Sequence, residues 1–514
     1  MTPDAPIERS GDASPRDVLL AAIAGAPVIV GEGAAAADGG ADGARSGREK
    51  DAANPSATPR GAPNTPTAPL NSDEALALAF ADEHAERLRY VATWGQWLSF
   101  DGKRWRADDT LFGLDEARKV CRRAAQACDG PKTAKELASA KTVAAVERLA
   151  KADRRLAATT DVWDRDLFLL NTPKGVVDLH DGTMRAHDPR DLITKSTSVA
   201  PHGDCPRFLR FLDEITHGDA ALVEYLRRVA GYALTGATTE HALFFAFGTG
   251  ANGKSVFLNT LAGVLGDYHR TAPIETFINS LGDRHPTELA RLRGARFVTA
   301  TETEEGRRWA ESKVKALTGG DRITARFMRQ DFFEFEPHFK LFMAGNHKPG
   351  LRSVDESIRR RFHLVPFAVT IPVEDRDQRL AEALRDEWPG VLAWAIEGCL
   401  AWQETGLSVP ECVRIATSDY LAAEDSVATW IEDRCDVGPN ESDTSANLFT
   451  SWASWANKAG EYVGSRKRLA QSLEAKGFFP ARDASARKFN GLRVHTESQE
   501  ETAPAYSDVD EGDR

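Results

Sequence analysis

One short segment of this sequence has the residue types and spacing that bind phosphate groups. It reads Gly248, Thr249, Gly250, Ala251, Asn252, Gly253, Lys254 and Ser255, which matches the G-x-x-x-x-G-K-[ST] template in full. The glycines let backbone N–H groups turn toward phosphate oxygens. Lys254 can reach the β- and γ-phosphates, and the Ser255 hydroxyl can coordinate Mg²⁺. The segment therefore predicts a site for ATP and Mg²⁺.

Carboxylates further along the chain can complete such a site. Glu302, Glu304 and Glu305 follow the apolar run Phe297–Thr301, and ligands of parallel sheets lie at the carboxyl ends of strands. Glu302, at the tip of the expected strand, is the first candidate for a metal ligand and catalytic carboxylate, and Glu304 is the second. Acidic residues also gather at helix starts, and the spacing does not decide among the three.

Two further groups could act on a bound triphosphate. Asn346 follows the apolar run Lys340–Ala344, where its amide could hydrogen-bond the γ-phosphate or the attacking water; the alternative is a turn-forming asparagine. Arg360 or Arg361 could stabilise the charge of a phosphoryl transition state, an effect of about 10³–10⁵ in rate. Because these arginines are far from the phosphate loop in sequence, a neighbouring subunit could supply them. The alternative is a basic surface turn.

Cations surround a Gly-Gly turn between the acidic run and Asn346. The segment predicts a loop that projects into a channel and grips a phosphate backbone; a solvated charged turn is the alternative. The candidate DNA-binding residues are Lys315, Arg322, Arg326 and Arg329.

The elements that must position these residues alternate between strands and helices over residues 206–405. The expected strands are Leu243–Phe247, Arg296–Thr301, Lys340–Ala344 and Phe362–Pro366, and the expected helix after the phosphate loop is Val256–Leu265. This alternation predicts an α/β fold with a parallel sheet covered by helices on both faces.

Regions of different character flank this core. Residues 73–205 predict a mixed α+β accessory domain with helices Glu74–Leu88, Leu114–Cys128 and Thr133–Ala158 and no catalytic pattern. Residues 425–495 predict two helices and a basic hairpin, the order of a winged helix. Residues 1–72 and the acidic 496–514 have too little apolar bulk to offset the entropy of ordering, so we expect a disordered leader and tail.

Composition sets wider limits. The chain has 514 residues, of which 42% are hydrophobic and 28% charged, as in an ordinary globular protein. Its six scattered cysteines argue against a zinc site or disulfides and favour a reducing cytoplasm. No apolar run approaches the roughly 20 residues of a membrane helix. The net charge of −12 does not exclude a nucleic-acid partner, because phosphate binding needs cations only on the surface that contacts the nucleic acid.

Together the motifs resemble the superfamily III helicases, specifically the phage, plasmid and poxvirus-type primase–helicases. They follow one another in the family's order within about 115 residues. The resemblance extends backward through Asp82–Arg87, Trp97–Trp105 and Leu169–Leu179, and covers roughly residues 75 to 400. No carboxylate cluster in the leader could hold metals for nucleotide polymerisation, so we expect the helicase portion without a primase domain.

The resemblance implies an AAA+-like ATPase core that assembles into a hexameric ring and unwinds duplex DNA with ATP and Mg²⁺, with single-stranded and forked DNA as its partners. It implies replication of a phage, prophage or plasmid in the cytoplasm of a bacterial host, with a separate primase and an origin-binding protein as candidate partners and no membrane. By the same resemblance, Glu302 takes the acidic role, Asn346 senses the nucleotide, and Arg360 or Arg361 is the inter-subunit finger.

Three other classes of phosphate-loop protein are alternatives to a helicase. A DNA-packaging ATPase would bring a nuclease domain with clustered aspartates, which the sequence lacks, and a small-molecule kinase would need no finger from a neighbour. An ATP-switched, DNA-binding replication initiator would use the winged helix and would not separate strands.

Overall fold

The computed structural model describes residues 68–279, 287–301, 307–329, 331–351, 354–482 and 487–495. The chain divides into two compact units between His202 and Gly203. The expected tail and most of the expected leader lie outside the described residues, as do Glu302, Glu304 and Glu305. None of the helices in the described ranges combines the length and apolar character needed to cross a bilayer.

The first unit contains helices and small sheets. Its helices are α2 (Asp73–His84), α3 (Phe112–Gln126), α4 (Pro131–Leu137) and α5 (Ala140–Ala150). The prediction of one helix over Thr133–Ala158 is wrong. The Ser139 hydroxyl accepts a hydrogen bond from the Thr142 N–H and begins α5 as an N-cap, so the segment divides into two helices.

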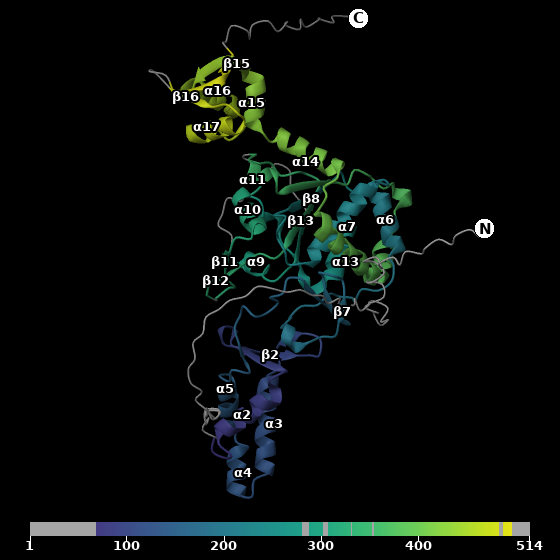
Figure 1. The fold of residues 1–514 in the computed structure, drawn as a ribbon, viewed down its shortest axis with the longest axis vertical. Helices are drawn as coiled ribbons and strands as arrows, with labels where there is room; N and C mark the ends of the chain where they lie inside the picture. Colours follow the sequence, from purple (N-terminus) through teal and green to yellow (C-terminus); the bar gives the residue numbers. More distant parts are fainter. Residues whose placement is uncertain are drawn as a thin grey trace, which may run out of the picture. The chain divides into compact units, whose positions relative to one another are not determined.

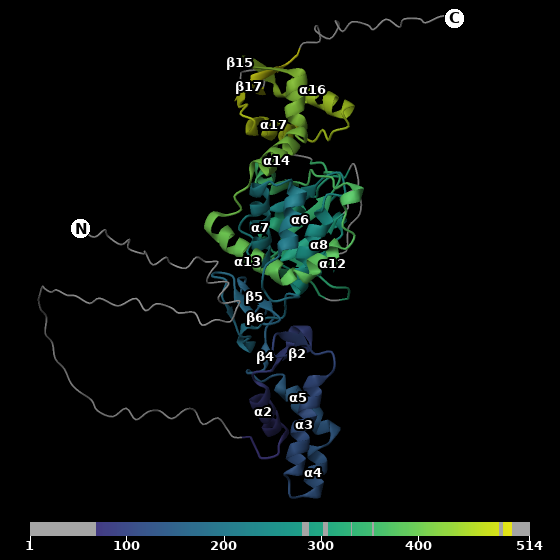
Figure 2. The same ribbon diagram turned by 90° about the vertical axis from the view of Figure 1, so that its right-hand side faces the viewer.

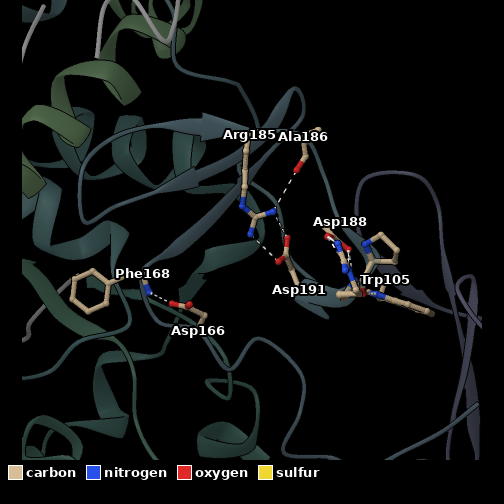
Figure 3. Close-up of polar contacts among 9 residues, drawn as sticks. Trp105, Asp166, Phe168, Arg185, Ala186, Asp188 and Asp191 are labelled. Atoms are coloured by element: carbon tan, nitrogen blue, oxygen red, sulfur yellow. Dashed lines mark hydrogen bonds and ion pairs between the residues drawn. The ribbon is translucent and has the colours of Figure 1, made fainter. Parts of the chain in front are cut away.

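Two antiparallel-rich sheets complete this unit. The strands are β1 (Leu88–Val91), β2 (Gln96–Phe100), β3 (Trp105–Ala107), β4 (Ala157–Ala158), β5 (Leu169–Thr172), β6 (Gly175–Asp178) and β7 (Met184–Arg185). One sheet has the order β3-β2-β1-β4 and the other β5-β6-β7. The turn after β7 is held by the bidentate pair of Arg185 with Asp191, and the Trp105 indole donates to the Pro189 carbonyl at 2.8 Å, which ties this turn to β3 (Figure 3).

A five-stranded parallel sheet forms the centre of the second unit. Its strands are β8 (Leu243–Phe247), β9 (His269–Thr271), β10 (Phe297–Thr301), β13 (Lys340–Gly345) and β14 (Phe362–Pro366). The order is β14-β8-β13-β10-β9, and every neighbouring pair is parallel. The four expected strands are therefore confirmed to within one residue at each end, and β9 is an additional edge strand.

Helices cover both faces of this sheet, as the alternation predicts. On one face, a cluster of strand side chains that includes Phe245, Met343 and Leu364 packs against Trp309 and Tyr420. On the other face, the ring centre of Phe244 lies 6.4 Å from that of Tyr225 in α7. The ring centre of Phe342 lies 6.0 Å from that of Phe257 in α8. Figure 1 shows α7 alongside α13, and Figure 2 shows α6 beside α8. The helices of this region are α6 (Pro206–Thr216), α7 (Ala220–Leu234), α8 (Lys254–Leu265), α9 (Thr287–Ala290), α10 (Glu311–Gly319), α11 (Glu356–Arg359), α12 (Leu380–Asp386), α13 (Trp388–Thr405) and α14 (Glu411–Ala423).

A β-hairpin stands where a single charged loop was expected. Lys315 lies within α10, and β11 (Ile323–Ala325) then pairs with β12 (Phe333–Phe335) in an antiparallel ladder. Ile323, Ala325 and Phe335 are buried and join the core on the Trp309 side of the sheet. The prediction of a loop over Lys315–Arg329 is wrong because these apolar side chains anchor two short strands to that core.

The last elements form a small helical subdomain with a three-stranded antiparallel sheet. They are α15 (Ser426–Arg434), β15 (Cys435–Thr444), α16 (Ser445–Lys458), α17 (Arg466–Ala475), β16 (Pro480–Arg482) and β17 (Arg487–Val494). The sheet order is β15-β17-β16. Trp430, Leu448, Leu473 and Leu492 are buried in its own core, and the expected helices and basic strand are present.

Candidate functional site

The glycines of the phosphate loop are required by close approaches of other atoms. A Cβ on Gly248 would lie 2.2 Å from the carbonyl oxygen of Phe367, the residue after β14. Gly253 has a φ of +81°, and a Cβ there would lie 2.5 Å from Ile215 and 2.9 Å from Phe211 of α6. The loop is thus held between the end of β14 and α6, with no room for side chains at these positions.

A cavity of about 640 Å³ opens over this loop, within the range of small-ligand sites. It lies at the carboxyl ends of three strands, where parallel sheets place their ligands. The residues lining it are Gly250, Ala251, Asn252, Gly253, Lys254, Ser255, Val256, Asn259, Thr301, Ala344, Gly345 and Asn346. The structure therefore brings the phosphate loop and Asn346 together in one cavity.

Lys254 is the central charged group of this cavity. Its side chain is buried, with 6% of the residue exposed. Its Nζ donates to the Gly248 carbonyl at 2.8 Å, to Asn252 Oδ1 at 3.0 Å and to Asn346 Oδ1 at 3.3 Å. All three acceptors are neutral, and burial lowers the pKa of the ammonium group. An anionic phosphate beside Lys254 would offset the desolvation of the ammonium group and would raise its pKa again.

Asn252 braces the loop from within. Its Nδ2 donates to the Phe367 carbonyl at 3.0 Å while its Oδ1 accepts from Lys254. The side chain is buried, so it links the phosphate loop to the end of β14. The sequence places Asn252 in the loop but gives no sign of this brace, because its partner lies 115 positions away.

The sheet order explains how Asn346 reaches the loop. The strand β13 lies between β8 and β10, so the residues after it fall between the phosphate loop and Thr301. Asn346 is exposed toward solvent apart from its contact with Lys254. A side-chain amide in this place can hydrogen-bond a terminal phosphate or a water beside it.

Of the two predicted metal ligands, Ser255 and Glu302, the structure describes only Ser255. Ser255, at the start of α8, is exposed and lines the cavity, so its hydroxyl can reach a metal ion bound to phosphate oxygens. Thr301, the last residue of β10, also lines the cavity. Glu302 is the next residue in the sequence and Glu304 follows two positions later, but both lie outside the described residues.

The two candidate finger arginines have opposite environments. Arg361 is buried, with 6% exposed, and its guanidinium donates to Thr318 Oγ1 at 3.1 Å and to the Ser357 carbonyl at 2.7 Å. Arg360 is exposed, and its side chain forms no hydrogen bond or ion pair with another described residue. Arg361 therefore joins α10 to α11, whereas Arg360 is accessible from outside the chain.

The four candidate DNA-binding residues are distributed over the hairpin and the helix before it. Lys315 Nζ lies 2.6 Å from Asp355 Oδ2, and Arg322 Nε lies 3.2 Å from Glu336 Oε1. Arg326 and Arg329 lie in the connection between β11 and β12. The structure thus engages two of the four cations with carboxylates.

Comparison with known proteins adds two matched segments. Residues 77–217 match the model described as D5 N terminal like, and residues 246–361 match a family of unknown function, DUF5906. A protein of Acanthamoeba polyphaga mimivirus named "Putative helicase L207/L206" is 27% identical over 295 residues, and Frog virus 3 "Putative helicase 022R" is 25% identical over 318 residues. These alignments cover 52% and 57% of this chain, and the chain spans about a third of each relative, 31% and 32%.

Among solved structures, the apo form of the NrS-1 C-terminal region aligns with 8% identity and a TM-score of 0.45, covering 82% of this chain and 98% of that one. A second form of the same region has a TM-score of 0.42 and 10% identity, with coverage of 76% and 83%. By sequence, the chain is similar to viral proteins named as helicases and contains a D5 N-terminal-like segment.

Proposed function

We propose that this chain is an ATP- and Mg²⁺-dependent DNA helicase of the replication type, working as a ring of identical subunits. One observation carries the proposal: the Lys254 ammonium group at the carboxyl edge of the sheet is hydrogen-bonded to Asn346 of a second strand. This pairing joins a phosphate-binding cation to a polar group suited to sense the terminal phosphate. The viral relatives named as helicases support the DNA-unwinding part of the proposal.

In this proposal, the chain's own residues bind and orient the triphosphate. The backbone of the phosphate loop and Lys254 hold the phosphates, and Lys254 exchanges neutral acceptors for anionic oxygens. Ser255 and Glu302 hold Mg²⁺, which neutralises charge that develops on the phosphates. Asn346 orients the attacking water, and Glu302 or Glu304 accepts its proton.

The location of Arg360 supports assembly. The register pairs Phe362 with Leu243 and Pro366 with Phe247, so Arg360 lies at the amino edge of the sheet while the phosphate loop lies at the carboxyl edge. A strand of this length spans roughly 15 Å. Arg360 therefore cannot serve the nucleotide of its own subunit and would act on that of a neighbour, as in a closed hexamer.

The C-terminal subdomain supports a DNA partner. Its order of helix, strand, helix, helix and two-stranded hairpin is that of a winged helix. Arg466 and Lys467 lie exposed at the start of α17, the helix that would enter a groove. We infer an N-terminal domain over residues 73–205, an ATPase domain over 206–405 and a winged helix over 425–495.

The test is strand separation of a forked DNA by the purified chain with ATP and Mg²⁺, with Lys254→Ala in parallel. We expect the wild type to unwind the fork and the variant to lose both unwinding and ATP hydrolysis. An absence of ATP hydrolysis in the wild type, with and without DNA, would overturn the proposal.

The winged-helix order favours one second candidate, an ATP-switched replication initiator. An initiator would bind duplex DNA and hydrolyse ATP in its presence without separating strands. The same forked substrate distinguishes the two, because only the helicase releases the displaced strand.

A further inference from the structure

The tip of the β11–β12 hairpin exposes an unusual concentration of large apolar side chains. Phe327, Met328 and Phe332 are 37%, 69% and 58% exposed. Exposed apolar groups gathered on one short segment commonly mark a binding surface. We call Phe327, Met328 and Phe332 the hairpin tip.

The rings of the hairpin tip are held by stacking against cations and other rings. The Arg326 guanidinium lies 4.6 Å from the centre of the Phe332 ring. Phe327 stacks on Phe333 with ring centres 5.8 Å apart and an interplanar angle of 27°. Phe333 in turn lies beneath the guanidinium of Arg293 at 5.3 Å and packs against the core of the sheet. The tip is thus anchored at its base and apolar at its end.

Two of the candidate DNA-binding cations are already engaged by carboxylates. Lys315 and Arg322 are paired with Asp355 and Glu336, which leaves Arg326 and Arg329 as the cations of the tip. The hairpin tip thus combines two cations with three exposed apolar side chains, and the apolar side chains can add to any binding by charge. Among nucleic acids, only unpaired strands offer the flat faces of their bases to such rings.

We propose that the hairpin tip binds single-stranded nucleic acid by stacking bases on Phe332 and Phe327, with Arg326 and Arg329 neutralising the adjacent phosphates. This inference rests on the proposed helicase function and gives its DNA-binding element a preference for bases over backbone. Phe332 is the principal platform because it is the more exposed of the two rings.

The experiment measures binding of the full chain to a fluorescent oligothymidylate and to an abasic strand of the same length, at several salt concentrations. One stacked base contributes roughly 5- to 150-fold in affinity, so we expect the wild type to prefer the base-bearing strand by at least 5-fold. Phe332→Ala and Phe332→Leu should lose this preference, while Phe332→Trp should keep it.

Salt dependence separates stacking from charge. In Phe332→Ala, the slope of log affinity against log salt should stay unchanged, whereas Arg329→Ala should make it shallower by about one phosphate contact. Ile415→Ala, a truncation at another exposed apolar side chain, is the matched control and should behave as wild type.

Two results would overturn the inference. One is equal affinity of the wild type for abasic and base-bearing strands. The other is a Phe332→Ala variant that keeps base preference but changes oligomeric mass, which would make the tip a contact between subunits. ATP hydrolysis without DNA, measured on the same samples, tests the proposed function separately, because the hairpin lies outside the nucleotide cavity.

Discussion

At the scale of residues, two buried cations of the second unit are held by neutral oxygens and differ in what they can do. Lys254 faces a cavity, so its three neutral acceptors can be exchanged for phosphate. Arg361 faces Thr318 and Ser357 in the interior, so its contacts hold α10 and α11 together. A buried cation can bind a ligand only if it faces a cavity, as Lys254 does and Arg361 does not.

The adjacent pair Arg360 and Arg361 yields a matched test of this distinction. We expect Arg360→Ala to lower ATP turnover by about 10³–10⁵ with an unchanged melting temperature. Arg361→Ala removes hydrogen bonds to a charged group that contribute about 1.5–3 kcal/mol each, so it should lower the melting temperature. Turnover and thermal unfolding of both variants check this.

Mixing supplies the control. We expect Arg360→Ala and Lys254→Ala to be inactive when each is assayed alone. A mixed ring would contain interfaces that pair an intact arginine with an intact phosphate loop. Recovered hydrolysis on mixing is the expected result. Full activity of Arg360→Ala would remove it from the proposed finger role.

The phosphate loop Gly248–Ser255 could be predicted from the sequence, because its residues are adjacent and their types determine the chemistry. It could not rank Arg360 against Arg361, because adjacent residues share every local signal and differ only in which one faces the interior. The Lys254–Asn346 contact was equally hidden, since it depends on the order of strands in the sheet.

At the scale of elements, each edge strand of the sheet carries a partly buried, uncharged histidine. On β14, His363 Nδ1 lies 2.8 Å from the hydroxyl of Tyr225, and on β9, His269 Nε2 lies 2.8 Å from Thr299 Oγ1. Burial lowers the pKa of His363 and that of His269 to about 4 each. Both edges of the sheet therefore contain a group that resists protonation.

These histidines predict a loss of stability in mild acid. Between pH 6.5 and about 4, the unfolded chain binds protons at both positions and the folded chain does not, so the free energy of unfolding should fall as the pH falls. His363 should contribute up to about 3 kcal/mol of this loss. Chemical denaturation across that range measures it.

The control is His363→Gln, which retains a hydrogen-bonding side chain beside Tyr225 and does not titrate. Its stability should fall less steeply than that of the wild type between pH 6.5 and 4. Parallel curves for the two proteins would contradict the assignment.

Elements with continuous apolar runs could be predicted, and those that depend on partners could not. Leu243–Phe247 and Phe362–Pro366 are mostly buried and were predicted to the residue. The hairpin strands β11 and β12 are only three residues long, too short for a clear sequence pattern, so only their contact with the core identifies them.

At the scale of the whole molecule, none of the described residues that line the cavity over the phosphate loop is an arginine. In the proposed ring, Arg360 of a neighbour would complete the site, and ATP hydrolysis would then depend on assembly. Both the phosphate loop and Arg360 belong to the second unit, which begins at Gly203.

We therefore expect ATP turnover per subunit to rise with protein concentration and to level off when assembly is complete. Turnover and molecular mass, measured over the same dilution series, should change together. Constant turnover down to concentrations at which the chain is monomeric would contradict assembly-dependent catalysis.

The position of α6 has a consequence for how this protein can be divided. The D5 N-terminal-like match runs to residue 217 and so includes α6, yet Phe211 and Ile215 of that helix form the floor under Gly253. Glu387 also accepts hydrogen bonds from the first N–H groups of α6. A fragment begun at residue 218, or a recombination crossover there, would separate the phosphate loop from its floor. A fragment that keeps the phosphate loop in place therefore has to begin upstream of α6, inside the segment matched by the D5 N-terminal-like model.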